Sequence, residues 1–87
     1  STATIDVSNQ VMIYPNPANS FTTLELSEVM DIKNATMTIY NQLGQVMVKQ
    51  PVRSNKMKVN TFNYASGMYF IEIKTSKGKA IKKLIIN

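Results

Sequence analysis

The sequence predicts an all-β domain, a sandwich of seven short antiparallel strands. Apolar and polar residues alternate with a period of two in several segments, which is the pattern of strands with one buried face. Turn residues separate these segments at intervals of roughly 8–12 residues, as in β-sandwiches. Helical spacing is confined to 27–34, where Ser27 could cap a single turn too short to be stable alone.

The alternation assigns each segment an inner and an outer face. The expected strands are 11–14, 21–26, 36–41, 45–50, 56–61, 67–75 and 80–86. The side chains expected to point into the core are Leu24, Leu26, Met37, Ile39, Val46, Val48, Met57, Val59, Tyr69, Ile71, Ile73, Ile81, Leu84 and Ile86. The aromatic ring of Phe70 is expected on a partly covered second face.

Glycines and prolines mark the connections. Gly44 is expected at positive φ in a tight hairpin, and Gly78 is expected to do the same before the last strand. Pro15 and Pro17 have no N–H donor, and they bias Asn16 and its neighbours toward extended conformations. The segment around these prolines should therefore end the first strand and form a stiff, extended connection.

The composition argues against catalysis. The 87 residues suffice for one domain with a modest core. The chain contains no cysteine and no histidine, so the commonest nucleophiles, bases and transition-metal ligands are missing. Its five carboxylates fall on different expected elements, and its three glycines are isolated. We therefore expect no enzyme activity, no cofactor and no metal site.

Charge is distributed unevenly along the chain. Residues 1–44 carry a net charge of −3, and residues 45–87 carry eight lysines and one arginine against one carboxylate, a net charge of +8. A basic half containing Tyr69 and Phe70 could bind nucleic acid or an anionic lipid surface. Lysines on solvated strand faces, which discourage edge-to-edge pairing, are the simpler explanation, and we expect no nucleic-acid partner. The sequence shows no transmembrane segment and no signal peptide.

Four motifs stand in register over residues 11–87: Tyr14-Pro15-Asn16-Pro17-Ala18, Leu43-Gly44-Gln45-Val46, Gly67-Met68-Tyr69-Phe70-Ile71, and Gly78 followed by Lys83-Leu84-Ile85-Ile86. Together they resemble the type A C-terminal sorting domains of the bacterial type IX secretion system. One position departs from the family pattern, because Tyr64 stands where the family usually has leucine. A tyrosine can fill an apolar slot when its hydroxyl reaches a partner or solvent.

The resemblance implies a fold and a function. It implies an immunoglobulin-like sandwich over residues 11–87, preceded by a linker from an upstream cargo over residues 1–10. Such domains direct cargo through the periplasm and across the outer membrane, where a shuttle protein and the translocon are the expected partners. It further implies a cell-surface sortase that cleaves within or before residues 1–10, after which the cargo is attached to the surface or released without the domain.

The last strand is the candidate recognition element. Burying Ile81, Leu84 and Ile86 should contribute about 5–9 kcal/mol, while ordering that strand costs about 6–14 kcal/mol. A strand this close to balance could be offered to a receptor by strand addition or by peeling. The residues expected to form the recognition surface are Lys83, Leu84, Ile85, Ile86 and Asn87, with Gly67 and Tyr69 nearby.

Three points stay open at this level. Ile85 falls on the face opposite Leu84, where it is either covered or available to a partner. An exposed edge beside the proline segment would permit a strand-exchanged homodimer of the isolated domain. The alternative function is a non-catalytic β-sandwich module that binds carbohydrate or another surface, which would need an exposed aromatic platform or a calcium cage.

Overall fold

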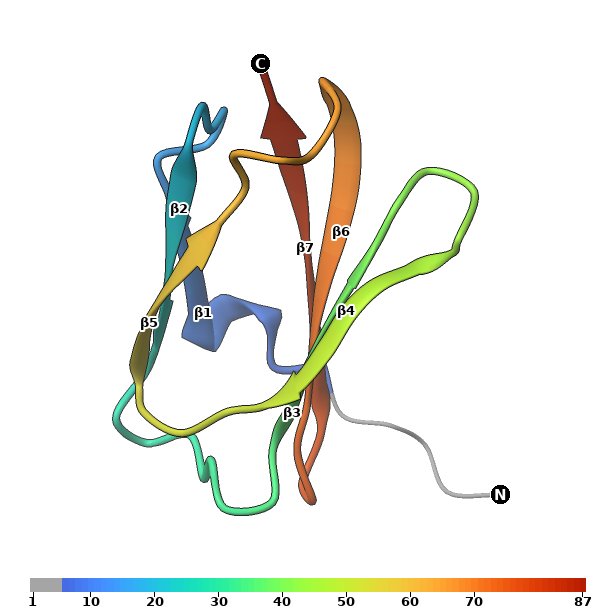
Figure 1. Cartoon of the computed structure of the whole chain (residues 1–87). Coiled ribbons are helices and arrows are strands. Elements are labelled where there is room, and N and C mark those ends of the chain that lie inside the picture. The colour runs from blue at the N-terminus through green and yellow to red at the C-terminus, as the bar shows by residue number, and fades with distance from the viewer. Residues whose placement is uncertain (1–5) are drawn as a thin grey trace.

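The computed structural model describes residues 6–87, which form two antiparallel sheets packed face to face (Figure 1). A short 3-10 turn, η1 (Ser8–Gln10), precedes seven strands: β1 (Val11–Tyr14), β2 (Phe21–Leu26), β3 (Thr36–Tyr40), β4 (Val46–Pro51), β5 (Lys56–Asn60), β6 (Gly67–Lys74) and β7 (Lys79–Ile86). The strand orders are β1-β2-β5 and β4-β3-β6-β7. The predicted seven-stranded, immunoglobulin-like sandwich is confirmed.

The core lies between the two sheets and is built from alternate residues of their central strands. Leu24 of β2 faces Ile39 of β3 and Ile71 and Ile73 of β6 across the interior, and all four are at most 1% exposed. The antiparallel register sets Ile39 opposite Ile71, which continues the apolar layer across the larger sheet. Period-two alternation therefore predicted this part of the core correctly.

Val46 does not reach the core, contrary to the prediction. The pairing of β3 with β4 shifts register between Ile39 and Tyr40, so Val48 lies opposite Ile39 whereas Val46 lies opposite Tyr40. Such a bulge adds a residue to one strand and reverses the faces beyond it. Val46 consequently lies on the outer face and is 56% exposed. Val48, on the inner side of the bulge, is half-buried.

Ile81 is likewise on the outer face, where it is 47% exposed. The register pairs it with Glu72, an outer-face residue of β6. The inner face of β7 takes every second residue from Ala80, through half-buried Lys82, to Leu84 and Ile86. Ile81 therefore contributes less to docking the strand than its hydrophobicity suggests.

Two connections differ from the prediction, at Gly78 and at residues 27–34, and the one at Gly44 agrees with it. Gly44 has a φ of 81°, as predicted, and its N–H donates to the Asn41 carbonyl over 3.0 Å. Gly78 is not in the positive-φ region. Its hairpin is closed instead by the Thr75 hydroxyl, which accepts from the N–H of Gly78 over 3.0 Å. Residues 27–34 form turns rather than a helical turn, one of them closed by the N–H of Met30 on the Ser27 carbonyl.

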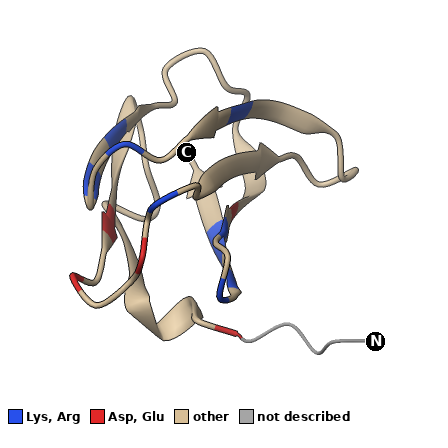
Figure 2. Ribbon diagram, turned by 90° about the horizontal axis from the view of Figure 1, so that it is seen from below, with Lys and Arg blue, Asp and Glu red and all other residues tan. Residues whose placement is uncertain are grey.

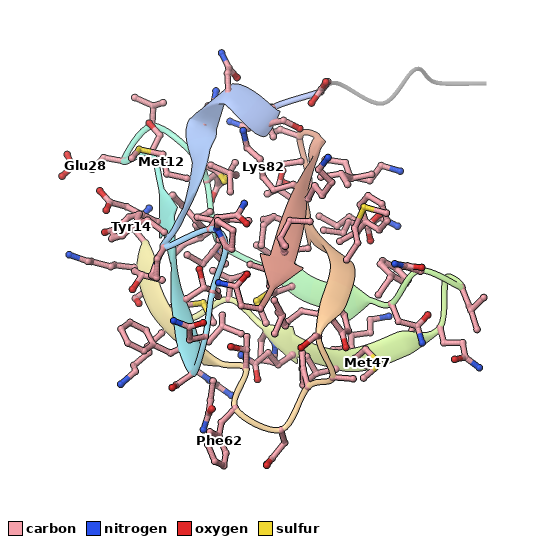
Figure 3. The ribbon with its side chains drawn as sticks, turned by 90° about the horizontal axis from the view of Figure 1, so that it is seen from above. Met12, Tyr14, Glu28, Met47, Phe62 and Lys82 are labelled. Atoms are coloured by element: carbon pink, nitrogen blue, oxygen red, sulfur yellow. The ribbon has the colours of Figure 1, made fainter. Side chains whose placement is uncertain are left out.

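Charged and apolar side chains both remain on the surface. Figure 2 shows where the acidic and basic residues lie along the ribbon; four of the five acidic residues belong to residues 1–44 and nine of the ten basic residues to residues 45–87. Phe62 and Met47 are 73% and 42% exposed (Figure 3). No helix among the described residues is long and apolar enough to cross a membrane.

Candidate functional site

The register of β6 and β7 brings the two halves of the predicted recognition surface together. Gly67 lies opposite Ile86, Met68 opposite Ile85, and Tyr69 opposite Leu84. The two strands are consecutive in sequence, joined by the Thr75–Gly78 hairpin, so this pairing follows directly from the alternating pattern and the turn. We call the seven predicted residues, Gly67, Tyr69 and Lys83–Asn87, the recognition residues.

The recognition residues divide between the core and the surface. Leu84, Ile86 and Tyr69 are buried, with 0%, 3% and 6% of their surfaces exposed. Lys83 and Asn87 are exposed, and Ile85 is half-buried beside Met68. Ile85 is thus neither fully covered nor fully available. Among the recognition residues, a partner that contacts the folded domain can reach exposed Lys83 and Asn87 and half-buried Ile85 and Gly67.

Tyr69 is held in place by its hydroxyl and by its ring. Its hydroxyl donates to the Ala65 carbonyl over 2.7 Å. Its ring lies 5.3 Å from the ring of Tyr64, at a tilt of 33°. Tyr64 packs half-buried against the core, so the position that departs from the family pattern is filled by an aromatic pair rather than left empty. Burial, followed by the neighbouring Tyr69, raises the pKa of Tyr64 above its ordinary value.

The outer edge of β7, the side away from β6, is covered at its end by the proline segment. The side-chain amide of Asn16 makes two bonds to this edge: its Nδ2 donates to the Lys83 carbonyl over 2.8 Å, and its Oδ1 accepts from the Ile85 N–H over 3.0 Å. Ala18 continues the pattern, donating to the Ile85 carbonyl over 2.7 Å and accepting from the Asn87 N–H over 2.9 Å. Ala18 and Ile86 form a parallel bridge.

The other end of the same edge is covered by residues next to η1. The Val7 N–H donates to the Lys79 carbonyl over 3.0 Å, and the Ser8 hydroxyl accepts from the Ile81 N–H over 3.0 Å. Residues 6–10, which the sequence assigns to the linker, are therefore bound to β7 in this structure. Along the described chain the β7 edge is occupied at both ends, as an exposed edge must be to resist unwanted pairing.

The proline segment is itself held by β2 and by the loop after β5. Its connection from β1 has cis peptide bonds at Tyr14–Pro15 and Asn16–Pro17. The buried Thr22 hydroxyl donates to the Pro15 carbonyl over 2.9 Å, and the Thr61 N–H donates to the Ser20 carbonyl over 2.9 Å. Ala18 is fully buried between these contacts, whereas Asn16 is exposed.

Sequence reasoning predicted the proline segment and the last strand separately, and it missed their contact. It also missed Val7 and Ser8, for which the sequence carries no recognisable signal. Ala18 has a signal, because a single small residue between turn-forming residues permits the close approach of two backbones. Two other glycines of the family motifs do not belong to the recognition residues: Gly44 is in the β3–β4 hairpin, and Gly78 precedes the first residue of β7.

Gly67 has a backbone conformation that only glycine adopts readily, with a φ of 147°. A Cβ there would meet nothing closer than the Gln42 side chain, at 4.0 Å. We expect Gly67→Ala to destabilise the domain by about 1–3 kcal/mol through backbone strain alone. Chemical denaturation would measure the change, with Ser66→Ala as the neighbouring control, expected within about 0.5 kcal/mol of wild type. Equal stability of Gly67→Ala and wild type would show that the backbone relaxes.

The titratable groups form no catalytic arrangement in the described part of the chain. No three acidic or metal-ligating side chains of residues 6–87 lie together in a way that could hold a metal ion. Burial, and then the charge of Glu72, raises the pKa of Tyr40, whose hydroxyl donates to Glu72 over 3.2 Å. Glu72 also lies 3.7 Å from the Lys79 ammonium. A hydrogen bond donated to Glu25 raises the pKa of Tyr14, and hydrogen bonds from Ser8 lower the pKa of Asp6.

The sequence model of one family, the secretion system C-terminal sorting domain, matches residues 12–87. The chain belongs to this family. It is a sorting domain of type IX secretion, a family of sorting signals rather than of catalysts. The match begins at the second residue of β1, and it includes the other six strands and all the recognition residues.

Curated relatives carry the sorting domain as a small part of a longer chain. The sorting domain is 38% identical over 71 residues to a β-agarase A of Zobellia galactanivorans, covering 79% of this chain and 12% of the relative. It is 32% identical over 79 residues to the ulvan lyase NLR42 of Nonlabens ulvanivorans, covering 88% of this chain and 14% of the relative. The enzyme names therefore describe those whole proteins.

A solved structure shares the fold. PorZ, a bacterial surface component of the type IX secretion system of Porphyromonas gingivalis, matches 91% of the sorting domain and 12% of its own chain, with a TM-score of 0.75. The sequence identity is 19%, so this likeness concerns the fold alone.

Proposed function

We propose that this sorting domain directs an attached cargo protein across the outer membrane and that the recognition residues form part of the surface read by the secretion machinery. The observation that carries the proposal is the pairing of Gly67–Tyr69 with Leu84–Ile86, within a chain that belongs to the sorting family. The partners would be the outer-membrane translocon and its shuttle protein. The cargo would pass through the periplasm and reach the cell surface or the medium.

The exposed recognition residues suit a protein partner. Ile85 offers a half-buried apolar contact beside Met68, and Lys83 and Asn87 flank it with polar groups. An apolar centre with a polar rim is the usual composition of a protein interface. The described residues around Ile85 include no carboxylate pair or metal cluster that would favour a catalytic role here.

Sortase cleavage upstream of the domain is the second part of the proposal. A protease acts on an accessible, extended chain, and Val7 and Ser8 are hydrogen-bonded to β7. These contacts favour cleavage on the N-terminal side of Val7, within the predicted linker of residues 1–10. The cargo would then be attached to the cell surface or released, and the sorting domain would be removed.

Fusion of residues 1–87 to a neutral periplasmic reporter tests the function. In a cell with a type IX system, we expect the reporter at the surface or in the medium, and in an otherwise identical translocon mutant we expect it in the periplasm. Mass spectrometry of the released reporter would locate the cleavage bond. Periplasmic retention in both strains would contradict the proposal, and retention by binding to cell-envelope glycans would instead support the carbohydrate-binding alternative.

A further inference from the structure

We propose that residues 15–19, which we call the clasp, occupy the place of a partner strand on β7. In recognition, an extended segment of the secretion machinery, running parallel to β7, replaces the clasp along Lys83–Asn87. This inference rests on the proposed sorting function and adds to it the binding edge, the direction of the partner strand and a requirement for one small partner residue.

The hydrogen bonds of the clasp reproduce those of a regular parallel strand. In a parallel pair of strands, the N–H of one residue donates to a carbonyl on the partner strand, and the carbonyl of the same residue accepts from the N–H two positions later on that strand. The residue two positions further along the first strand repeats this pair of bonds. The Asn16 side chain does so across Lys83 and Ile85, and the backbone of Ala18 does so across Ile85 and Asn87. The side-chain amide of Asn16 thus replaces a peptide group opposite Leu84.

The burial of Ala18 defines what a replacing strand must carry. Ala18 is fully buried opposite Ile86 and belongs to the hydrophobic core of the domain. A larger side chain there would have to push apart the contacts of a densely packed interior. The partner strand should therefore present alanine, serine or glycine opposite Ile86, two residues after the residue that lies opposite Leu84.

Apart from the bonds that the Thr22 and Thr61 hydroxyls donate to the Pro15 and Asn19 carbonyls, the clasp has few contacts that would resist replacement. Pro15, Asn16 and Pro17 are exposed, and the prolines cannot donate a backbone hydrogen bond to β7. Only Ala18 among residues 15–19 is buried, and its side chain is a single methyl group. A partner strand with a continuous backbone would restore the same four hydrogen bonds and add apolar contacts that the clasp does not supply.

The clasp also differs from the protection of the far edge of the smaller sheet, where β5 lies. β5, at the edge of the smaller sheet, places Lys56 and Lys58 on its exposed positions, which oppose strand addition permanently. The β7 edge is protected by an occupant instead of by charge. Because the clasp can leave the β7 edge, it can block pairing with other proteins in transit and still allow a receptor strand to bind β7.

A disulfide across the clasp provides the test. The side chain of Asn87 donates to the Asn19 side chain over 3.3 Å, and the chain has no cysteine of its own. Asn19→Cys with Asn87→Cys would lock the clasp in the oxidising periplasm. The matched control is Asn41→Cys with Gln45→Cys, whose side chains meet over 2.8 Å in the β3–β4 hairpin, outside the clasp and its bonds to β7. Thiol labelling after extraction measures closure of each lock.

We expect the clasp lock to reduce export of the fused reporter at least tenfold, with folded reporter protein accumulating in the periplasm. The hairpin lock and the Asn19→Cys single variant should be exported as wild type, and the clasp lock should be exported at least tenfold less than the Asn87→Cys single variant. Export of the oxidised clasp lock at the wild-type level would overturn the inference and leave the sorting function intact. Failure of the wild-type fusion itself would instead contradict the proposed function.

A second variant opens the clasp, so the result does not depend on disulfide formation. Asn16→Ala removes both side-chain bonds to β7 and leaves Ala18 in place. We expect amide exchange at Ile85 to rise at least tenfold while exchange at Ile39 is unchanged, and export to be at least that of wild type. Lost export from a folded Asn16→Ala domain would overturn the inference. It would mean that the secretion machinery recognises the domain with the clasp in place on β7.

Discussion

Deletion of Leu84–Asn87 should unfold the sorting domain and abolish export of a fused reporter. The deletion removes Leu84 and Ile86, which are 0% and 3% exposed. Removing a buried aliphatic side chain of this size costs about 2–5 kcal/mol, and a small domain has only about 5–15 kcal/mol in total. The deletion also leaves Gly67–Tyr69 and Ala18 without their pairing partners. Circular dichroism of the purified domain and reporter localisation would measure the two effects separately.

A shorter deletion separates folding from recognition in this experiment. Removing Asn87 alone breaks its N–H bond to the Ala18 carbonyl and its side-chain bond to Asn19, but keeps the core residues. We expect this variant to fold and to show a smaller export defect. Normal export after deletion of Leu84–Asn87 would refute the role of β7, whether or not the domain folds.

Leu84→Ala is the second change with a large expected effect. Leu84 is fully buried opposite Tyr69, so its truncation should destabilise the domain by about 2–5 kcal/mol. In a domain of this size, 1 kcal/mol corresponds to about 4–8 °C in melting temperature. We therefore expect a loss of at least about 8 °C in a calorimetric scan. Export should fall with the folded fraction.

Ile85→Thr is the matched variant on the opposite face of the same strand. Threonine keeps the β-branched shape, and Ile85 is only half-buried, so the stability loss should be below about 1.5 kcal/mol. If Ile85 contacts the machinery, export should fall although the domain remains folded. Parallel loss of export and stability in both variants would leave β7 with a structural role only.

Most of the fold could be predicted from local pattern. Alternation in β2, β3 and β6 identified Leu24, Met37, Ile39, Tyr69, Ile71 and Ile73 as core residues, and all are at most 6% exposed. The errors occurred where alternation does not define the face. A bulge reversed the orientation of Val46. Ile81 was assigned to the core because it is hydrophobic, although it lies an odd number of residues from Leu84 and therefore on the opposite face of β7. Gly78 illustrates a third case, in which the Thr75 hydroxyl rather than positive φ shapes the turn.

Local sequence pattern predicted only part of the candidate site. The motifs around Gly67 and Lys83–Ile86 belong to consecutive strands, so their meeting is a local consequence of one hairpin. The contact between Asn16 and Ile85 joins positions 69 residues apart, and no periodicity reports it. Residues 6–10 present the same difficulty, because their polar composition predicts a linker although Val7 and Ser8 bind β7.

The amino-acid sequence by itself determined the strands, most of the core and the sorting family, because alternation and turn residues act between neighbours in the chain. Only the tertiary structure decided that the last strand is covered along its outer edge, and by which residues. Backbone hydrogen-bonding groups are the same in every residue except proline, so the sequence does not state which edge pairs with which segment. That choice is made when the two sheets pack, which brings Asn16 and Ala18 beside Lys83–Asn87.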